Sequence, residues 1–325
     1  MTADGAFETR LKAQALGLGF DLVGITQLGP AETSAVFERW LEDGYHGSMD
    51  YLRRGAELRQ DTTRPEPGML SAVVVGLDYG GRSPSGPIAR YARGDDYHRV
   101  MWDRLETLLA WVRAERGAAV RGRAYVDTGP ILERDLGRRA GLGWFGKNAM
   151  LINPKKGSYF FIGSLFLDLA LTPDAPFTSD HCGSCTRCLT SCPTDAFAAP
   201  GVLDARRCIA YLTIEHRGPI PDEFHRAIGE HLFGCDVCQE VCPWNVRFAS
   251  PPPTDGPLAP RVPFAGGIPT ATLAREFRDP GAAGYRERTR GSAIRRAKQD
   301  GLARNAAIVL ANLGEGDPIA ESPSP

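Results

Sequence analysis

The chain has 325 residues, of which 42% are hydrophobic, and its formal net charge at pH 7 is −1. That length and composition are sufficient for one or two buried cores, and the near-neutral charge argues neither for nor against a nucleic-acid partner. The sequence has no run of about twenty apolar residues, and its polar N-terminus does not resemble a secretory signal. We therefore expect a cytoplasmic, monomeric protein without membrane contact.

The first 170 residues alternate between helical and strand-like patterns. Apolar residues recur at helical spacing in three segments, and short apolar runs that predict buried strands lie between them. The helical segments are Leu11–Leu16, Ser34–Leu41 and Tyr97–Arg116, and the strand candidates are Asp21–Ile25, Ala72–Leu77, Ala124–Val126 and Tyr159–Leu167. This order predicts a mixed α/β domain over residues 1–170 and leaves the strand order open.

The second half of the chain divides into three further parts. A connector after Asp168 leads into a cysteine-rich domain that we place at residues 171–250. The proline-dense stretch from Ser250 to Pro263 predicts an extended linker. Beyond it, Ser292–Leu313 predicts two helices, or one helix broken at Gly301. We assign residues 251–313 to a linker and helical region and residues 314–325 to a disordered tail.

All eight cysteines lie between Cys182 and Cys242. A disulfide framework is not expected in a long chain without a secretory signal, so this clustering indicates metal ligation in a reducing compartment. The first run, Cys182-x2-Cys185-x2-Cys188-x3-Cys192-Pro193, has the bacterial ferredoxin spacing, in which three cysteines bind one cluster and the fourth binds the other.

The second cysteine run lacks one early ligand, which Cys208 can supply. Eight ligands then suffice for two 4Fe–4S clusters in a ferredoxin-like domain. The predicted ligands are Cys182, Cys185, Cys188 and Cys242 for the first cluster, and Cys192, Cys208, Cys235 and Cys238 for the second. The alternative is a pair of four-cysteine zinc sites, but zinc knuckles do not favour the CxxCxxCxxxCP pattern.

Several motifs, in the same order along the chain, resemble those of epoxyqueuosine reductases. They are RGDDYH at Arg93–His98, VDTGPILER at Val126–Arg134, RAGLGWFGKN at Arg139–Asn148, GSY at Gly157–Tyr159, and both cysteine runs. The resemblance covers roughly residues 5 to 313. It implies a nitroreductase-like cobalamin-binding domain, a ferredoxin-like domain with two 4Fe–4S clusters, and a short HEAT-like helical region at the C-terminus.

The resemblance also implies an activity. That family, which is related to the reductive dehalogenases, reduces the epoxide of epoxyqueuosine to the alkene of queuosine at the wobble position of tRNA. Electrons from an external donor of the flavodoxin or ferredoxin type pass through the two clusters to cobalamin, and the substrate tRNAs carry a GUN anticodon. The alternatives are another cobalamin and iron–sulfur reductase, similar to a dehalogenase, or a plain ferredoxin-type electron carrier. The long N-terminal region disfavours the carrier.

Asp127 matches the proton donor of that family. Opening an epoxide requires protonation of its oxygen, which a carboxyl group held partly neutral by its surroundings can supply. From the residues alone, Asp127 could instead cap a helix that begins near Pro130. The roles of Tyr97 and His98 are left open. The resemblance implies cobalamin contacts by Arg59, Asp127, Lys147, Asn148, Leu151 and Ser158; a lysine after the glycine-rich stretch could equally lie on the surface.

The C-terminal region carries a group of basic residues. Such a group can neutralise RNA phosphates, although a run of charge is more often a solvated face. With a tRNA substrate implied, we predict that these residues bind tRNA. They are Arg286, Arg288, Arg290, Arg295, Arg296, Lys298 and Arg304.

Overall fold

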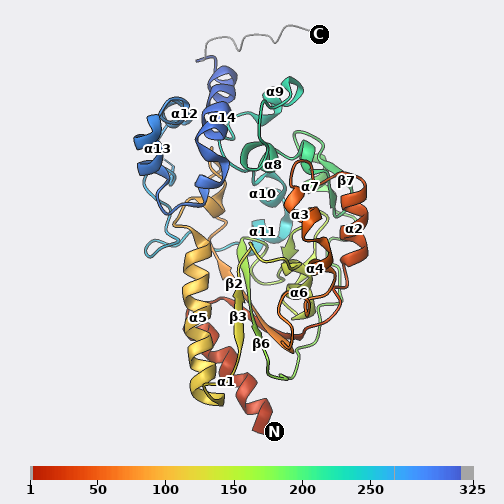
Figure 1. The fold of residues 1–325 in the computed structure, drawn as a ribbon. Coiled ribbons are helices and arrows are strands. Elements are labelled where there is room, and N and C mark those ends of the chain that lie inside the picture. The colour runs from red at the N-terminus through yellow and green to blue at the C-terminus, as the bar shows by residue number, and fades with distance from the viewer. Residues whose placement is uncertain (1–2, 267, 316–325) are drawn as a thin grey trace.

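The computed structural model describes residues 3–266 and 268–315 and is built around a four-stranded sheet with the order β1-β2-β6-β3 (Figure 1). Every pair of neighbouring strands is antiparallel. The strands are β1 (Leu22–Gln27), β2 (Ser71–Asp78), β3 (Gly122–Tyr125) and β6 (Phe160–Leu167). All four strands expected from the sequence are confirmed, each with bounds that differ by at most two residues.

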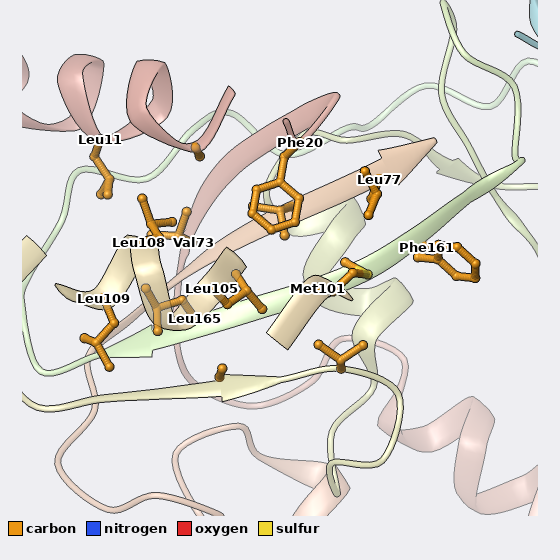
Figure 2. Packing of buried hydrophobic residues seen from close by; sticks show 14 of the residues in the cluster. Leu11, Phe20, Val73, Leu77, Met101, Leu105, Leu108, Leu109, Phe161 and Leu165 are labelled. Carbon is orange, nitrogen blue, oxygen red and sulfur yellow. The ribbon is translucent and has the colours of Figure 1, made fainter. Parts of the chain in front are cut away.

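Side chains of β2 alternate between two hydrophobic cores, one on each face of the sheet. Val73, Val75 and Leu77 belong to the core under helices α1 (Ala3–Gly17) and α5 (Tyr97–Arg116). Figure 1 shows these two helices beside the sheet, and Figure 2 shows Val73 and Leu77 in the core. The intervening side chains of β2 belong to the core that includes Leu136 of helix α6 (Glu133–Arg139). Because successive side chains of a strand point to opposite faces, one apolar strand can serve both cores.

Helix α5 has the bounds predicted from its apolar spacing. Its first turn is capped by Asp96, whose carboxylate accepts a hydrogen bond from the backbone N–H of His98 at 3.1 Å. An aspartate at this position satisfies one of the unpaired N–H groups of the helix end. The buried residues of the helix are Met101, Leu105, Leu108, Leu109 and Val112. Local capping and periodicity therefore suffice to fix this element.

The remaining elements are short, apart from those at the C-terminus. In the N-terminal half they are α2 (Ser34–Glu42), α3 (Asp50–Arg54), α4 (Ala56–Gln60), η1 (Arg90–Ala92), β4 (Trp144–Phe145) and β5 (Leu151–Ile152). Around the cysteines they are α7 (Arg187–Thr190), β7 (Phe197–Ala199), β8 (Val202–Leu203), η2 (Ala205–Arg207), α8 (Ile209–Ile214), η3 (Asp222–Phe224), α9 (His225–Ile228), α10 (Val237–Glu240) and α11 (Pro243–Phe248). None of the described helices has both the length and the apolar content needed to cross a bilayer.

The C-terminal helical region packs around a buried cluster that it shares with Ile88, Ala92, Leu232 and Phe233. It contains α12 (Thr270–Arg278), α13 (Gly281–Thr289), η4 (Ala293–Ala297) and α14 (Lys298–Asn312). Side chains of α12 and α14, including Leu273, Phe277 and Leu302, share one buried cluster. The sequence analysis did not identify α12 and α13. Of the predicted tail, Gly314 and Glu315 follow α14, and residues 316–325 lie outside the described residues.

The predicted helix break at Gly301 is wrong. Gly301 lies inside α14, and the chain instead turns at Lys298, where φ is 65° and ψ is 170°. This backbone conformation is one that glycine adopts freely and that other residues adopt at a cost. The prediction failed because a glycine usually marks such a break in a helix. Here packing around η4 imposes the strained backbone conformation on a lysine instead.

We expect Lys298→Gly to stabilise the protein by about 1 kcal/mol, because glycine relieves the strain at this position. Lys298→Ala is the matched control, since it removes the same charge but keeps a side chain at the strained position. Urea unfolding of both variants measures the difference in the free energy of unfolding. Equal stabilities for the two variants would contradict the assignment of strain to Lys298.

Candidate active site and cluster-binding site

Asp127 lies in the loop between β3 and α6, in a left-handed conformation with φ of 58°. Its backbone N–H donates a hydrogen bond of 2.7 Å to Oε1 of Glu133. The side chain is 60% exposed. The alternative role as a helix cap is excluded here, because α6 begins at Glu133 and its cap position is Leu132. A strained, solvent-facing carboxylate is instead typical of a functional loop.

The carboxylate of Asp127 faces His98 on the first turn of α5. Nε2 of His98 lies 3.3 Å from Oδ2 of Asp127, and Nδ1 lies 2.6 Å from Oδ1 of Asp96. Desolvation alone would lower the pKa of His98, but its hydrogen bonds with the two carboxylates raise the pKa to about 9. At neutral pH the ring is therefore an imidazolium that donates to both aspartates.

The expectation that Asp127 is held partly neutral is wrong. Desolvation raises the pKa of this carboxyl, but the hydrogen bond and charge of His98, together with Tyr97, outweigh it and hold the pKa below its usual range. Asp127 is thus ionised at neutral pH. Glu133 shows the opposite behaviour, since desolvation, followed by the charge of Asp127, raises its pKa to about 8. Two carboxyl groups shifted in opposite directions are a common feature of acid–base sites.

Tyr97 holds the imidazole ring in place. Its ring stacks on His98 with centroids 4.1 Å apart, and on Phe161 of β6 at the same distance. The sequence analysis left the roles of Tyr97 and His98 open and did not consider Glu133. The signal for all three lay in the motifs RGDDYH and VDTGPILER, but only the tertiary structure brings α5 next to the Asp127 loop.

The eight thiols gather in two groups that match the predicted ligand sets. Electrostatic interactions link Cys188 with the thiols of Cys182, Cys185 and Cys242. In the second group, Cys235 interacts with Cys192 and Cys208, and Cys238 with Cys208 and Cys235. All eight cysteines are free. The ligand assignment itself stays a prediction.

The side chains of the predicted cobalamin contacts Lys147, Asn148 and Ser158 point toward the cysteine segment. Nζ of Lys147 donates to the carbonyls of Gly183 and Cys185, at 2.6 and 3.0 Å. Nδ2 of Asn148 donates to the carbonyl of Cys238 at 3.2 Å, and the Ser158 hydroxyl donates to Oε1 of Gln239 at 2.9 Å. Arg59 and Leu151 are buried. Three of the five side chains thus form hydrogen bonds with the cysteine segment.

The predicted tRNA-binding residues differ in their contacts. Arg286, Arg290 and Arg295 line an open depression of about 460 Å³ near α13. Arg288 pairs with Glu276 at 3.2 Å. Lys298 occupies the turn described above, and Arg296 pairs with Glu215. Arg304 differs from the others, because its guanidinium donates to the carbonyls of Leu212, His216 and Gly218.

Arg304 is consequently expected to act on stability. We expect Arg304→Met to lower the free energy of unfolding by about 2 kcal/mol, because three carbonyls lose their donor. The exposed Arg290 is the matched control, and Arg290→Met should change stability by less than about 0.5 kcal/mol. Thermal unfolding separates the two variants. An Arg304→Met protein as stable as the wild type would show that these hydrogen bonds are dispensable.

Two family models match the chain. The model described as "Epoxyqueuosine reductase QueG, DUF1730" matches residues 59–128, and "4Fe-4S double cluster binding domain" matches residues 181–245. The first match ends one residue after Asp127 and includes His98. The second begins one residue before Cys182 and includes all eight cysteines, which supports iron–sulfur clusters in place of zinc.

Curated relatives and solved structures agree with these matches. The chain is 42% identical to the epoxyqueuosine reductase of Pseudomonas aeruginosa over 94% of this chain and 85% of that protein. It is 38% identical to that of Escherichia coli, over 93% of this chain and 80% of that protein. A crystal structure of epoxyqueuosine reductase with an epoxyqueuosine-modified tRNA-Tyr stem loop matches with a TM-score of 0.85 and 28% identity, over 95% of this chain and 82% of that one.

A further solved structure of the same enzyme family also matches the chain. It is the Bacillus subtilis epoxyqueuosine reductase "with the … catalytic loop swung out of the active site", and it matches with a TM-score of 0.83 and 27% identity, over 95% of this chain and 82% of that chain. Sequence identity of this extent over nearly the whole chain, with the same fold, settles the family. The chain belongs to the epoxyqueuosine reductase family.

Proposed function

We propose that this protein is an oxidoreductase that reduces epoxyqueuosine to queuosine in tRNA. Converting the epoxide to the alkene consumes two electrons and two protons and releases water. The observation that carries the proposal is the exposed Asp127 carboxylate, hydrogen-bonded to a protonated His98, in a domain joined directly to the cysteine segment. A proton source would thus lie next to the segment that carries the electron path.

The electron path would run through the two thiol groups. Cys188 of the first group interacts with Cys238 of the second, so two clusters bound there would be neighbours. The carbonyl of Cys238 accepts a hydrogen bond from the side chain of Asn148. The carbonyl of the next residue, Ala149, accepts a hydrogen bond from Arg134, which follows the active-site loop in the sequence. An external flavodoxin- or ferredoxin-type protein would supply the electrons to the cluster pair.

The surroundings of Asp127 fit a large planar cofactor such as cobalamin. Trp102 is 44% exposed and follows His98 by one turn of α5. Exposed apolar rings beside a site indicate a surface that a ligand covers. Because the side chains of Lys147, Asn148 and Ser158 face the cysteine segment, these residues would hold cobalamin mainly through their backbone, together with Arg59 and Leu151. When bound, cobalamin supplies strongly reducing cobalt for the epoxide carbon.

The side chains of Asp127 and His98 would deliver the proton to the substrate oxygen. Asp127 would pass a proton to the substrate oxygen as the C–O bond breaks, and it would receive that proton from His98. Asp96 fixes the imidazole ring through Nδ1, so that Nε2 stays directed at Asp127. His98, with its raised pKa, is therefore the proton store, and Asp127 is the group that reaches the substrate.

The substrate would be a tRNA with a GUN anticodon. Arg286, Arg290 and Arg295 line one depression together with Glu287, which leaves a net positive charge that suits an RNA phosphate. Arg296 is close enough to the active site for its charge to act on Asp127. A soluble tRNA-modifying enzyme of this kind would work in the cytoplasm, as a monomer.

The test is metal analysis combined with turnover. Anaerobically purified protein, supplied with cobalamin, should contain about eight irons and one cobalt per chain and should convert an epoxyqueuosine-modified stem loop under a chemical reductant. Eight irons without cobalt or turnover would favour the electron-carrier alternative. A colourless protein containing zinc would overturn the proposal.

A further inference from the structure

Three side chains from distant parts of the sequence meet beside the active-site loop. They are Tyr51 of α3, Glu215 directly after α8, and Arg296 of η4. Nε and Nη2 of Arg296 donate to the two carboxylate oxygens of Glu215, at 2.7 and 2.9 Å. The guanidinium carbon of Arg296 lies 5.6 Å from the centre of the Tyr51 ring. We call these three residues the Tyr51 platform.

The platform lies within electrostatic range of the proposed proton donor. The charge of Arg296 lowers the pKa of Asp127, and the charge of Asp127 in turn acts on Tyr51. The side chain of Arg296 remains 51% exposed and Tyr51 41% exposed. A substrate that reaches Asp127 therefore passes close to a flat, cationic and aromatic surface.

A purely structural role accounts poorly for this arrangement. A half-exposed ion pair contributes little to stability, and a tyrosine ring in a core is normally covered. Arg304, in the same region, is an arginine with a structural role, because its guanidinium donates its hydrogen bonds to backbone carbonyls. Arg296 instead uses a bidentate pair with Glu215, which fixes the plane of the guanidinium and leaves it partly open to solvent.

Planar surfaces of this composition are suited to unpaired nucleobases. Proteins that read single-stranded loops of RNA stack splayed bases on aromatic rings and on guanidinium planes. The anticodon loop is single-stranded, and the modified base must leave its neighbours to reach Asp127. Resting on the function proposed above, we propose that Tyr51 and Arg296 bind a nucleobase of the anticodon loop by stacking, and that Glu215 positions Arg296 for this contact.

The binding experiment uses the cluster-loaded protein and a fluorescently labelled anticodon stem loop. Tyr51→Leu and Arg296→Met should each weaken binding by about tenfold to a hundredfold, while Tyr51→Phe, which keeps the ring, should bind within about threefold of the wild type. Glu215→Gln should weaken binding less than Arg296→Met does. Arg275→Met is the matched control, because Arg275 is also an exposed, ion-paired arginine of the C-terminal region and is not among the predicted tRNA-binding residues.

Iron content and the unfolding midpoint, measured on every variant, separate lost binding from lost folding. If a folded Tyr51→Leu protein bound the stem loop as tightly as the wild type, the proposed stacking role of the Tyr51 platform would be refuted. The result is independent of turnover: a wild-type protein that binds the stem loop through Tyr51 but does not reduce it would refute the proposed function and leave the platform standing. In turnover assays the platform variants should raise KM more than they lower kcat, since Tyr51 and Arg296 hold the substrate and do not protonate it.

Discussion

Asp127→Asn is expected to lower turnover of the epoxyqueuosine stem loop by about a hundredfold to ten-thousandfold, the range that positioned proton donors supply. The amide keeps the size of the side chain but cannot carry the proton from His98 to the substrate. The iron content should stay at the wild-type value, because Asp127 lies outside the predicted cluster ligands. Full turnover with both cofactors bound would remove Asp127 from the mechanism.

The control for this variant is Asp103→Asn, which removes an exposed carboxylate from the same helix that carries His98. It should leave turnover unchanged within about twofold, because surface substitutions away from special contacts have small effects. The comparison separates the loss of a particular carboxylate from a general change of charge near α5.

The effect of Asp127→Asn on the free energy of unfolding should depend on pH. In the wild type, the imidazolium of His98 interacts with ionised Asp127, which raises the pKa of His98 to about 9 and lowers that of Asp127. A raised histidine pKa contributes stability that is complete below about pH 6.5 and is lost as the pH rises through about 9; a lowered aspartate pKa contributes stability that is lost in acid. The stability advantage of the wild type over Asp127→Asn should therefore be largest between about pH 4 and 6.5, and should fade toward pH 10. Urea unfolding across this range measures it, and an advantage independent of pH would contradict the pair.

The second large effect is expected at Cys208. Cys208→Ser should reduce the iron content from about eight to about four per chain and abolish turnover, because the second cluster loses a ligand while the first keeps all four. Cys208 is the most informative choice because it lies outside both cysteine runs, and in the fold its thiol interacts with those of Cys192 and Cys235. Iron analysis and the visible absorption spectrum measure the loss.

Ser184→Ala is the matched control, since it changes an exposed residue between two ligands of the first cluster and removes none of them. It should retain both clusters. If Cys208→Ser kept about eight irons, the assignment of Cys208 would be wrong, and the second cluster would need a different fourth ligand.

The sequence by itself determined what depends on neighbours along the chain. The bounds of α5 followed from the Asp96 cap and the apolar spacing, and the strands followed from short apolar runs. The division of the cysteines followed from the ferredoxin spacing, and the motifs around Asp127 placed the chain in its family. These features are local, so a few consecutive residues suffice to encode them.

The tertiary structure alone decided which distant residues meet. His98 and Asp127 are brought together by packing of α5 and β3 on the same sheet, and their proximity reverses the expected protonation of the aspartate. The turn at Lys298 and the contact of Arg296 with Glu215 likewise depend on how the C-terminal helices pack. A pKa, a strained backbone or an ion pair depends on groups that are near in space and far apart in sequence, and spacing along the chain does not encode them.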